Sequence, residues 1–163
     1  MGYVRYQTYQ TGTYIIDELQ RSGAMAYLIE DGGDIIQFER HNGHQVRIHL
    51  IESSFPLYEI RNTLEYNARQ NVFTMFVLWA RMMLPAHAKT YDPEDWMEAL
   101  FTLYDGEIYG YDVFREETYL FPVRFRGDSK RRYIEYGTTA HFARLRTRIL
   151  ETGLEGFTGK WRV

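Results

Sequence analysis

The run VFTMFVLWARMML at residues 72–84 constrains the fold more than any other stretch of this chain. Its first part is almost entirely apolar and is rich in β-branched and aromatic side chains. Such a run is typical of a strand buried on both faces, as in the centre of a parallel sheet. The preceding residues 56–70 begin with Pro56 and carry apolar residues at helical spacing. We therefore expect a helix that leads into a central, parallel strand.

Three shorter segments upstream, residues 24–30, 34–40 and 45–52, read as strands. An Asp-Gly-Gly turn separates the first two, and Asn42-Gly43 lies between the second and third. Asn-Gly tolerates the positive φ that a two-residue hairpin needs. We expect these segments to form a meander.

Side-chain alternation assigns the polar residues of this meander to faces. Asp34 shares a face with Ile36, and Glu52 shares a face with Leu50, whereas His49 points to the opposite face. Asp34 and Glu52 are therefore expected on the same face of adjacent strands.

The other elements follow from caps and turns. Thr13 can cap a helix that ends near Ser22, and Asp92-Pro93 is a strong helix start. The remaining expected elements are a helix to about Tyr104, a hairpin of residues 107–114 and 118–125, a strand at 132–136, a helix from Thr138 or Thr139 to about Leu150, and an end at 153–163 that is irregular or a short strand.

Bulk composition indicates one globular domain over residues 1–163. Apolar residues make up 45% of the 163 and charged residues 25%. The absence of cysteine excludes disulfides, thiolate nucleophiles and sulfur-ligated metals. We find no signal peptide, no apolar run long enough for a membrane and no phosphate-binding glycine motif. A cytoplasmic protein without a membrane partner or a nucleotide cofactor is expected.

The order helix, three strands, helix, strand over residues 13–81 resembles the core of the PD-(D/E)xK nuclease superfamily, which includes restriction enzymes. The resemblance implies an α+β (α/β) fold, a mixed sheet flanked by helices, with an αβββαβ restriction-endonuclease-like core. Residues 92–163 would then be an extension made of a helix and a β-ribbon. In that family an Asp on the second strand and a Glu-x-Lys on the third hold a divalent metal, and the Lys orients an attacking water.

Asp34 matches the first acid of this pattern, but the third strand departs from it. Leu50 stands at the second acid position and Glu52 at the Lys position, so the centre is expected to be degenerate. If chemistry survives, Asp34, Glu52 and His49 are the catalytic candidates. Asp34 and Glu52, with Glu18 from the first helix, are then the candidate ligands of Mg²⁺ or Mn²⁺.

Charge is distributed unevenly along the chain. Residues 1–114 are net acidic and residues 115–163 are net basic. Arg forks suit phosphates, so DNA or RNA is a candidate partner. The residues predicted to contact it are Arg124, Arg126, Lys130, Arg131 and Arg132.

Aromatic residues make up 17% of the chain, and they alternate along the expected hairpin, as at Tyr109, Tyr111 and Tyr119. Such a ribbon could pair with a second copy, which predicts a homodimer. Three hypotheses result. The first is a nuclease-like scaffold without catalysis that binds nucleic acid or a protein. The second is an active metal-dependent nuclease. The third is a structural homo-oligomer with no nucleic-acid role.

Overall fold

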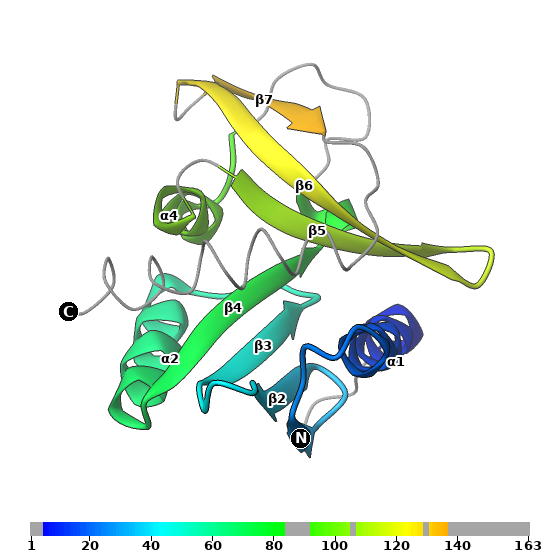
Figure 1. Cartoon of the computed structure of the whole chain (residues 1–163). Helices are drawn as coiled ribbons and strands as arrows, with labels where there is room; N and C mark the ends of the chain where they lie inside the picture. The colour runs from blue at the N-terminus through cyan, green and yellow to red at the C-terminus, as the bar shows by residue number, and fades with distance from the viewer. Residues whose placement is uncertain (1–4, 84–91, 105–106, 129–130, 137–163) are drawn as a thin grey trace.

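Seven strands form one mixed sheet, in which the strands follow the chain in the order β1-β2-β3-β4-β5-β6-β7 (Figure 1). The computed structural model describes residues 5–83, 92–104, 107–128 and 131–136. The strands are β1 (Tyr27–Asp31), β2 (Ile35–Glu39), β3 (Gln45–Ile51), β4 (Val72–Trp79), β5 (Glu107–Phe114), β6 (Glu117–Asp128) and β7 (Arg131–Tyr136). The helices are α1 (Tyr6–Arg21), α2 (Leu57–Arg69), α3 (Ala80–Met83) and α4 (Asp95–Leu103).

Strand direction divides the sheet into two antiparallel parts. β1, β2 and β3 form the expected meander, and β5, β6 and β7 form a second one. β4 lies between them and is parallel to both β3 and β5. The central parallel position predicted for the apolar run is confirmed, and it explains why most β4 side chains are buried.

The ladder between β4 and β5 is short. It pairs Val77 with Tyr109, Leu78 with Gly110 and Trp79 with Tyr111. The ladder between β3 and β4, by comparison, runs from Gln45 to Ile51. The two antiparallel parts are therefore joined through few backbone pairs.

Helices cover both faces of the sheet, α1 on one side and α2 with α4 on the other (Figure 1). On the α1 face, Ile15 and Leu19 pack with strand residues such as Ile36 and Tyr111. The opposite face holds a second cluster, which includes Ile60, Leu64, Phe76, Trp96, Leu100 and Ile108. Because strand side chains alternate, residue parity decides which helix layer a strand side chain meets.

Gly12 allows α1 to lie against the turn that precedes β2. A Cβ at this position would lie 2.9 Å from the carbonyl oxygen of Gly33. Gly33 itself has φ 87°, and the adjacent Gly32 N–H donates to the Ile35 carbonyl at 2.8 Å, so this backbone has little room to move. The close approach places α1 beside Asp34.

The first helix begins earlier than the sequence predicted. α1 starts at Tyr6, and the Thr13 hydroxyl donates to the Tyr9 carbonyl at 3.2 Å inside the helix, so Thr13 is no cap. Similarly, α4 starts at Asp95 and not at Asp92, and the apolar run leaves the sheet at Trp79. No helix in the described part of the chain has both the length and the apolar character needed to cross a bilayer.

The turn between β2 and β3 has three residues and not the expected two. The Gly43 N–H donates to the Arg40 carbonyl at 2.9 Å, and the Arg40 N–H donates to the His44 carbonyl at 2.8 Å. Gly43 takes the positive φ, at 85°, and Asn42 does not. The Asn42 side chain instead accepts from the His44 N–H at 3.0 Å.

The β5–β6 hairpin closes through a two-residue turn of unusual composition. Arg115 and Glu116 both have positive φ, at 50° and 66°, and Phe114 pairs with Glu117. This geometry normally selects Asn and Gly, because a left-handed conformation costs other residues about 1–2 kcal/mol each. The hairpin tip is therefore strained.

The aromatic ribbon is more deeply buried than the sequence predicted. Tyr109 and Tyr111 are 8% and 0% exposed, because β5 lies inside the sheet and α1 covers that face. The half-exposed strand proposed for dimer pairing is thus incorrect for these two residues. The predicted helix from Thr138 or Thr139 and the end at 153–163 lie outside the described residues.

Candidate functional site

Asp34 and Glu52 lie on the α1 face at neighbouring strand ends. The Leu50 N–H donates to the Asp34 carbonyl at 2.8 Å, which sets Asp34 opposite Leu50, and Glu52 lies two residues beyond. Burial raises the pKa of Asp34, a hydrogen bond to its own backbone lowers it in part, and the charges of Glu52 and Glu30 raise it further. The expected proximity of these two carboxylates is present.

The Glu52 carboxylate accepts hydrogen bonds from residues at the start of α1. It accepts the Arg5 backbone N–H at 3.1 Å and the Thr8 hydroxyl at 2.5 Å. The Arg5 guanidinium returns a bond to the Glu52 carbonyl at 3.1 Å. The carboxylate thus satisfies the backbone N–H of the N-cap residue Arg5, which lacks a partner within the helix, and bonds to a side chain of the first turn. Glu52 therefore acts as a distant cap of α1.

Tyr111 extends this network into the core. Its hydroxyl lies 2.7 Å from the Thr8 hydroxyl, and burial raises its pKa well above the ordinary value. The Arg5 guanidinium also stacks 4.8 Å from the centre of the Trp79 ring. The carboxylate predicted as a metal ligand is thus fixed by the chain's own donors.

Glu18 does not join Asp34 and Glu52. It pairs with Arg21 on the same helix at 2.9 Å. No group of three or more His, Asp or Glu side chains in the described ranges is placed to hold a metal ion. The predicted ligand set of Asp34, Glu52 and Glu18 is accordingly not assembled. Glu18 lies further along α1 than Gly12, the residue that meets the turn before β2.

His49 lies on the opposite face of the sheet, beneath α2. Its ring is 5.4 Å from the Phe76 ring, and its Nε2 is 3.3 Å from the Asn67 amide nitrogen. Burial and the nearby charge of Arg47 lower its pKa to about 4. Because the sheet separates His49 from Asp34 and Glu52, the three predicted catalytic residues do not share a site.

The predicted basic stretch spans β6 and β7. Arg124 is half-buried and Arg126 is exposed on β6, while Arg131 and Arg132 pair with the end of β6 in the backbone register. Lys130 and the side chains of β7 lie outside the described set. A nucleic-acid surface here stays a prediction.

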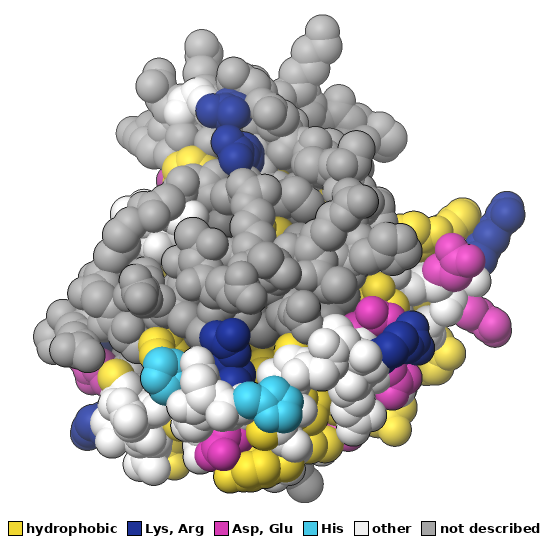
Figure 2. All heavy atoms as spheres, in the orientation of Figure 1, with side chains coloured by type: hydrophobic (Ala, Val, Ile, Leu, Met, Phe, Trp, Pro, Cys, Tyr) yellow, Lys and Arg dark blue, Asp and Glu magenta, His cyan; other side chains and the backbone are white. Residues whose placement is uncertain are grey.

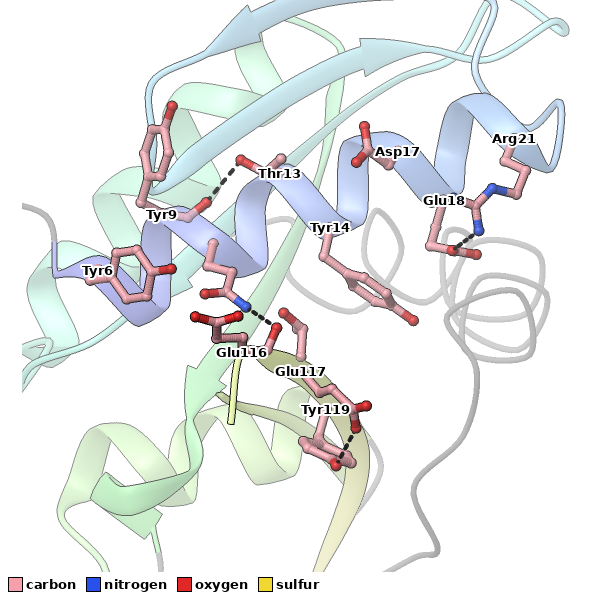
Figure 3. A pocket seen from close by; sticks show the side chains of 12 residues that line it. Tyr6, Tyr9, Thr13, Tyr14, Asp17, Glu18, Arg21, Glu116, Glu117 and Tyr119 are labelled. Carbon is pink, nitrogen blue, oxygen red and sulfur yellow. Dashed lines mark hydrogen bonds and ion pairs between the residues drawn. The ribbon is translucent and has the colours of Figure 1, made fainter. Parts of the chain in front are cut away.

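A groove of about 790 Å³ lies between α1 and the β5–β6 hairpin (Figure 3). Its size falls within the range of about 300–1,000 Å³ that is typical of ligand sites. Two kinds of side chain dominate its walls. The tyrosines are Tyr6, Tyr9, Tyr14 and Tyr119, and the carboxylates are Asp17, Glu18, Glu116 and Glu117.

Among the described residues that line the groove, Arg21 is the one cation and it pairs with Glu18, so this part of the lining is strongly acidic. The projecting hairpin tip carries acidic and hydrophobic side chains and, at its end, a basic one in the space-filling view (Figure 2). A hydrogen bond to Glu117 at 2.8 Å, with smaller contributions from burial and the charge of Glu117, raises the pKa of Tyr119.

Gln10 links the two walls and retains an unused acceptor. Its amide nitrogen donates to the Glu116 carbonyl at 2.6 Å, whereas its buried Oε1 has no hydrogen-bond partner among the described residues. Buried acceptors are normally satisfied, so this oxygen is an unsatisfied polar atom in the wall of the groove.

This groove escaped the sequence interpretation because its walls are far apart in the chain. A weak signal existed in the spacing of Tyr6 and Tyr9, but the helix was expected to begin only at Thr13. Comparison with known proteins adds no relative, since no family model, curated protein or solved structure matches the chain.

Proposed function

We propose that this chain is a non-catalytic binding protein built on a nuclease-like scaffold, and that its groove takes a Lys- or Arg-bearing segment of a protein partner. The observation that carries the proposal is the groove between α1 and the β5–β6 hairpin, with its tyrosine and carboxylate lining. Catalysis is not part of this function.

The scaffold part of the proposal is supported by the order of the helices and strands and by the hydrogen bonds that Glu52 makes. An antiparallel meander leads through α2 to a parallel strand, and Asp34 stands just before β2, as in the PD-(D/E)xK pattern. Glu52, however, bonds to Arg5 and Thr8 and so serves the fold. A carboxylate held in this way is a poor metal ligand, which favours a degenerate centre.

The ligand class follows from the chemistry of the groove. Carboxylates attract ammonium and guanidinium groups, and tyrosine rings attract cations and cover the methylenes of Lys and Arg. Tyr6 and Tyr9 are 66% and 60% exposed, so their rings are available at the surface.

The test uses fluorescein-labelled oligolysine and oligoarginine peptides, with oligoglutamate as the charge control, and measures fluorescence anisotropy across a salt series. Asp17→Asn/Glu117→Gln removes two groove charges with little change of shape. Glu59→Gln/Glu65→Gln on α2 is the matched control, because it changes net charge equally on the other face of the sheet.

We expect binding of the basic peptides to weaken with salt and to fall roughly tenfold in the groove variant. The control variant should change affinity by less than about twofold. Equal losses in both variants, or no binding of the basic peptides to the unaltered protein, would overturn the groove as a peptide site.

A second candidate function is a divalent-metal nuclease, and the raised pKa of Asp34 near Glu52 favours it. A cation between the two carboxylates would relieve their repulsion. Isothermal titration calorimetry with Mn²⁺ tests this directly. Heat that disappears in Asp34→Asn would support the nuclease, and absence of heat at millimolar Mn²⁺ would remove it.

A further inference from the structure

A partly buried arginine on the face away from α1 is held by neutral groups alone. The Arg47 Nε donates to the Gln37 side-chain oxygen at 2.9 Å, and one terminal nitrogen donates to the same oxygen. The other terminal nitrogen donates to the Asn67 side-chain oxygen at 2.5 Å. Among the described residues no carboxylate lies within ion-pair distance of Arg47.

These contacts leave donors unused. The guanidinium carries two N–H bonds on each terminal nitrogen, and only one on each is engaged by Gln37 and Asn67. A charged group removed from water without a counter-charge is unfavourable. Among the described residues, Arg47 is therefore a positive charge with no ion-paired carboxylate and with N–H groups that no protein acceptor engages.

The orientation of Arg47 is fixed by a buried network. Asn67 is 1% exposed, donates to the Thr74 hydroxyl at 2.8 Å and contacts the His49 ring at 3.3 Å. The Tyr66 ring centre lies 5.8 Å from the guanidinium carbon. Such support holds the donors in place before any ligand arrives, which lowers the cost of binding.

Beside this network lies a pocket of about 440 Å³. Its lining includes Arg47 and His49 of β3 and, from α2, Asn62, Thr63 and Tyr66. Ile35 adds an apolar side chain, and Glu30 of the exposed edge strand β1 also lines the pocket.

The two acid–base groups of the pocket restrict the ligand's charge. His49 stays neutral near pH 7, because burial and Arg47 lower its pKa to about 4, so it adds no positive charge. Glu30 opposes a second negative charge on the ligand. One fixed cation facing one carboxylate suits a monoanion better than a dianion.

From this geometry we propose that the pocket between β3 and α2 binds the carboxylate of a small organic acid, with the guanidinium of Arg47 as its anchor. Arg forks match carboxylates, and each charge-assisted bond is stronger than a neutral one. Ile35 and the Tyr66 ring provide apolar contacts for the body of the acid. The site is separate from the groove and does not depend on the proposed function.

The test is an NMR titration of the full chain with benzoate, with acetate and inorganic phosphate as comparison ligands. We expect saturable shifts at the Asn67 side-chain amide and at the Arg47 Nε–H, with benzoate binding more tightly than acetate. Bound carboxylate should also raise the pKa of His49, because it neutralises Arg47. Tighter binding of phosphate than of benzoate would overturn the carboxylate class.

Variants locate the site. Arg47→Gln should weaken benzoate roughly tenfold or more, whereas Arg61→Gln on the exposed side of α2 removes the same charge and should leave affinity unchanged. Glu30→Gln should tighten binding a few-fold by removing a repulsive charge, and it tests the site even if Arg47→Gln fails to fold. Unaltered affinity in Glu30→Gln together with no shift at Asn67 would refute the proposal.

Discussion

Charged side chains on the two faces of the sheet, in β3 and just beyond its end, have different roles. Toward α1, Glu52 receives its hydrogen bonds from Arg5 and Thr8, donors supplied by the fold itself. Toward α2, Arg47 donates to the side-chain oxygens of Gln37 and Asn67 and lies beside the Tyr66 ring. Among the described residues both charges have neutral hydrogen-bond partners, so the two roles differ in where each side chain lies. The Glu52 carboxylate joins a strand end to the start of α1 and stabilises the structure, whereas Arg47 lines a pocket and is available for the proposed ligand.

The largest expected effect on stability comes from removing the Glu52 carboxylate, and it tests this difference between the two faces. Glu52→Ala should lower the free energy of unfolding by about 2–3 kcal/mol, because it leaves the start of α1 without its charged acceptor. Urea unfolding measures the change. Thr8→Val should cost much less in the Glu52→Ala background than alone. A loss below about 0.5 kcal/mol would mean that Glu52 is free for chemistry.

The second prediction concerns acid stability on the α2 face. The pKa of His49 is about 4 in the folded chain against an ordinary value of 6.5. Below pH 6.5 the His49 side chain becomes protonated in the unfolded chain, whereas in the folded chain it stays neutral down to about pH 4. The free energy of unfolding therefore falls as the pH falls. The expected loss is about 2 kcal/mol between about pH 7 and pH 5. Urea unfolding of His49→Gln across this range should lack that component, and equal pH slopes would contradict the prediction.

The third prediction tests whether a change at Gly12, on the α1 face, leaves the opposite face unaffected. Gly12→Ala places a Cβ against the Gly33 carbonyl and should destabilise the chain by about 1–2 kcal/mol, although Ala favours helices. Thr13→Ala, at an exposed position of the same helix, is the control and should be neutral or slightly stabilising. Thermal unfolding measures both. Benzoate binding at Arg47 should be unaffected, and a parallel loss there would show that the faces are coupled.

The smallest expected effect is at Asp34. Its raised pKa means that the charged form is disfavoured in the folded chain, so Asp34→Asn should stabilise the chain slightly near pH 7. The folded protein binds this proton more readily, so the gain should shrink as the pH falls toward the ordinary value of 3.8. Urea unfolding at several pH values tests this. Destabilisation near pH 7 would indicate that the Asp34 charge has a favourable partner.

Local patterns predicted much of the fold. The apolar run gave the central strand, and alternation placed Asp34 with Glu52 and His49 away from them, because both depend only on neighbouring residues. The start of α1 was missed because Glu52, distant in the chain, holds Arg5. Tyr109 and Tyr111 were misjudged because their burial depends on α1 lying over β5, which no local pattern records.

The candidate sites were predicted less well, since both are assembled from remote segments. The groove needs α1 beside the hairpin at Glu116, and the pocket needs Asn67 of α2 beside Arg47. The residue types and their alternation identified Asp34 and Glu52 as candidates. They did not reveal that the Glu52 carboxylate bonds to Arg5 and Thr8. The partners that decide a role are long-range, and one sequence does not reveal them.

The short ladder of Val77, Leu78 and Trp79 with β5 has a mechanical consequence. A seam with so few interstrand bonds is where a sheet first opens, so amide hydrogens of β5 facing β4 should exchange with solvent sooner than those between β3 and β4. Small rotations about this seam would swing the hairpin relative to α1 and change the width of the groove.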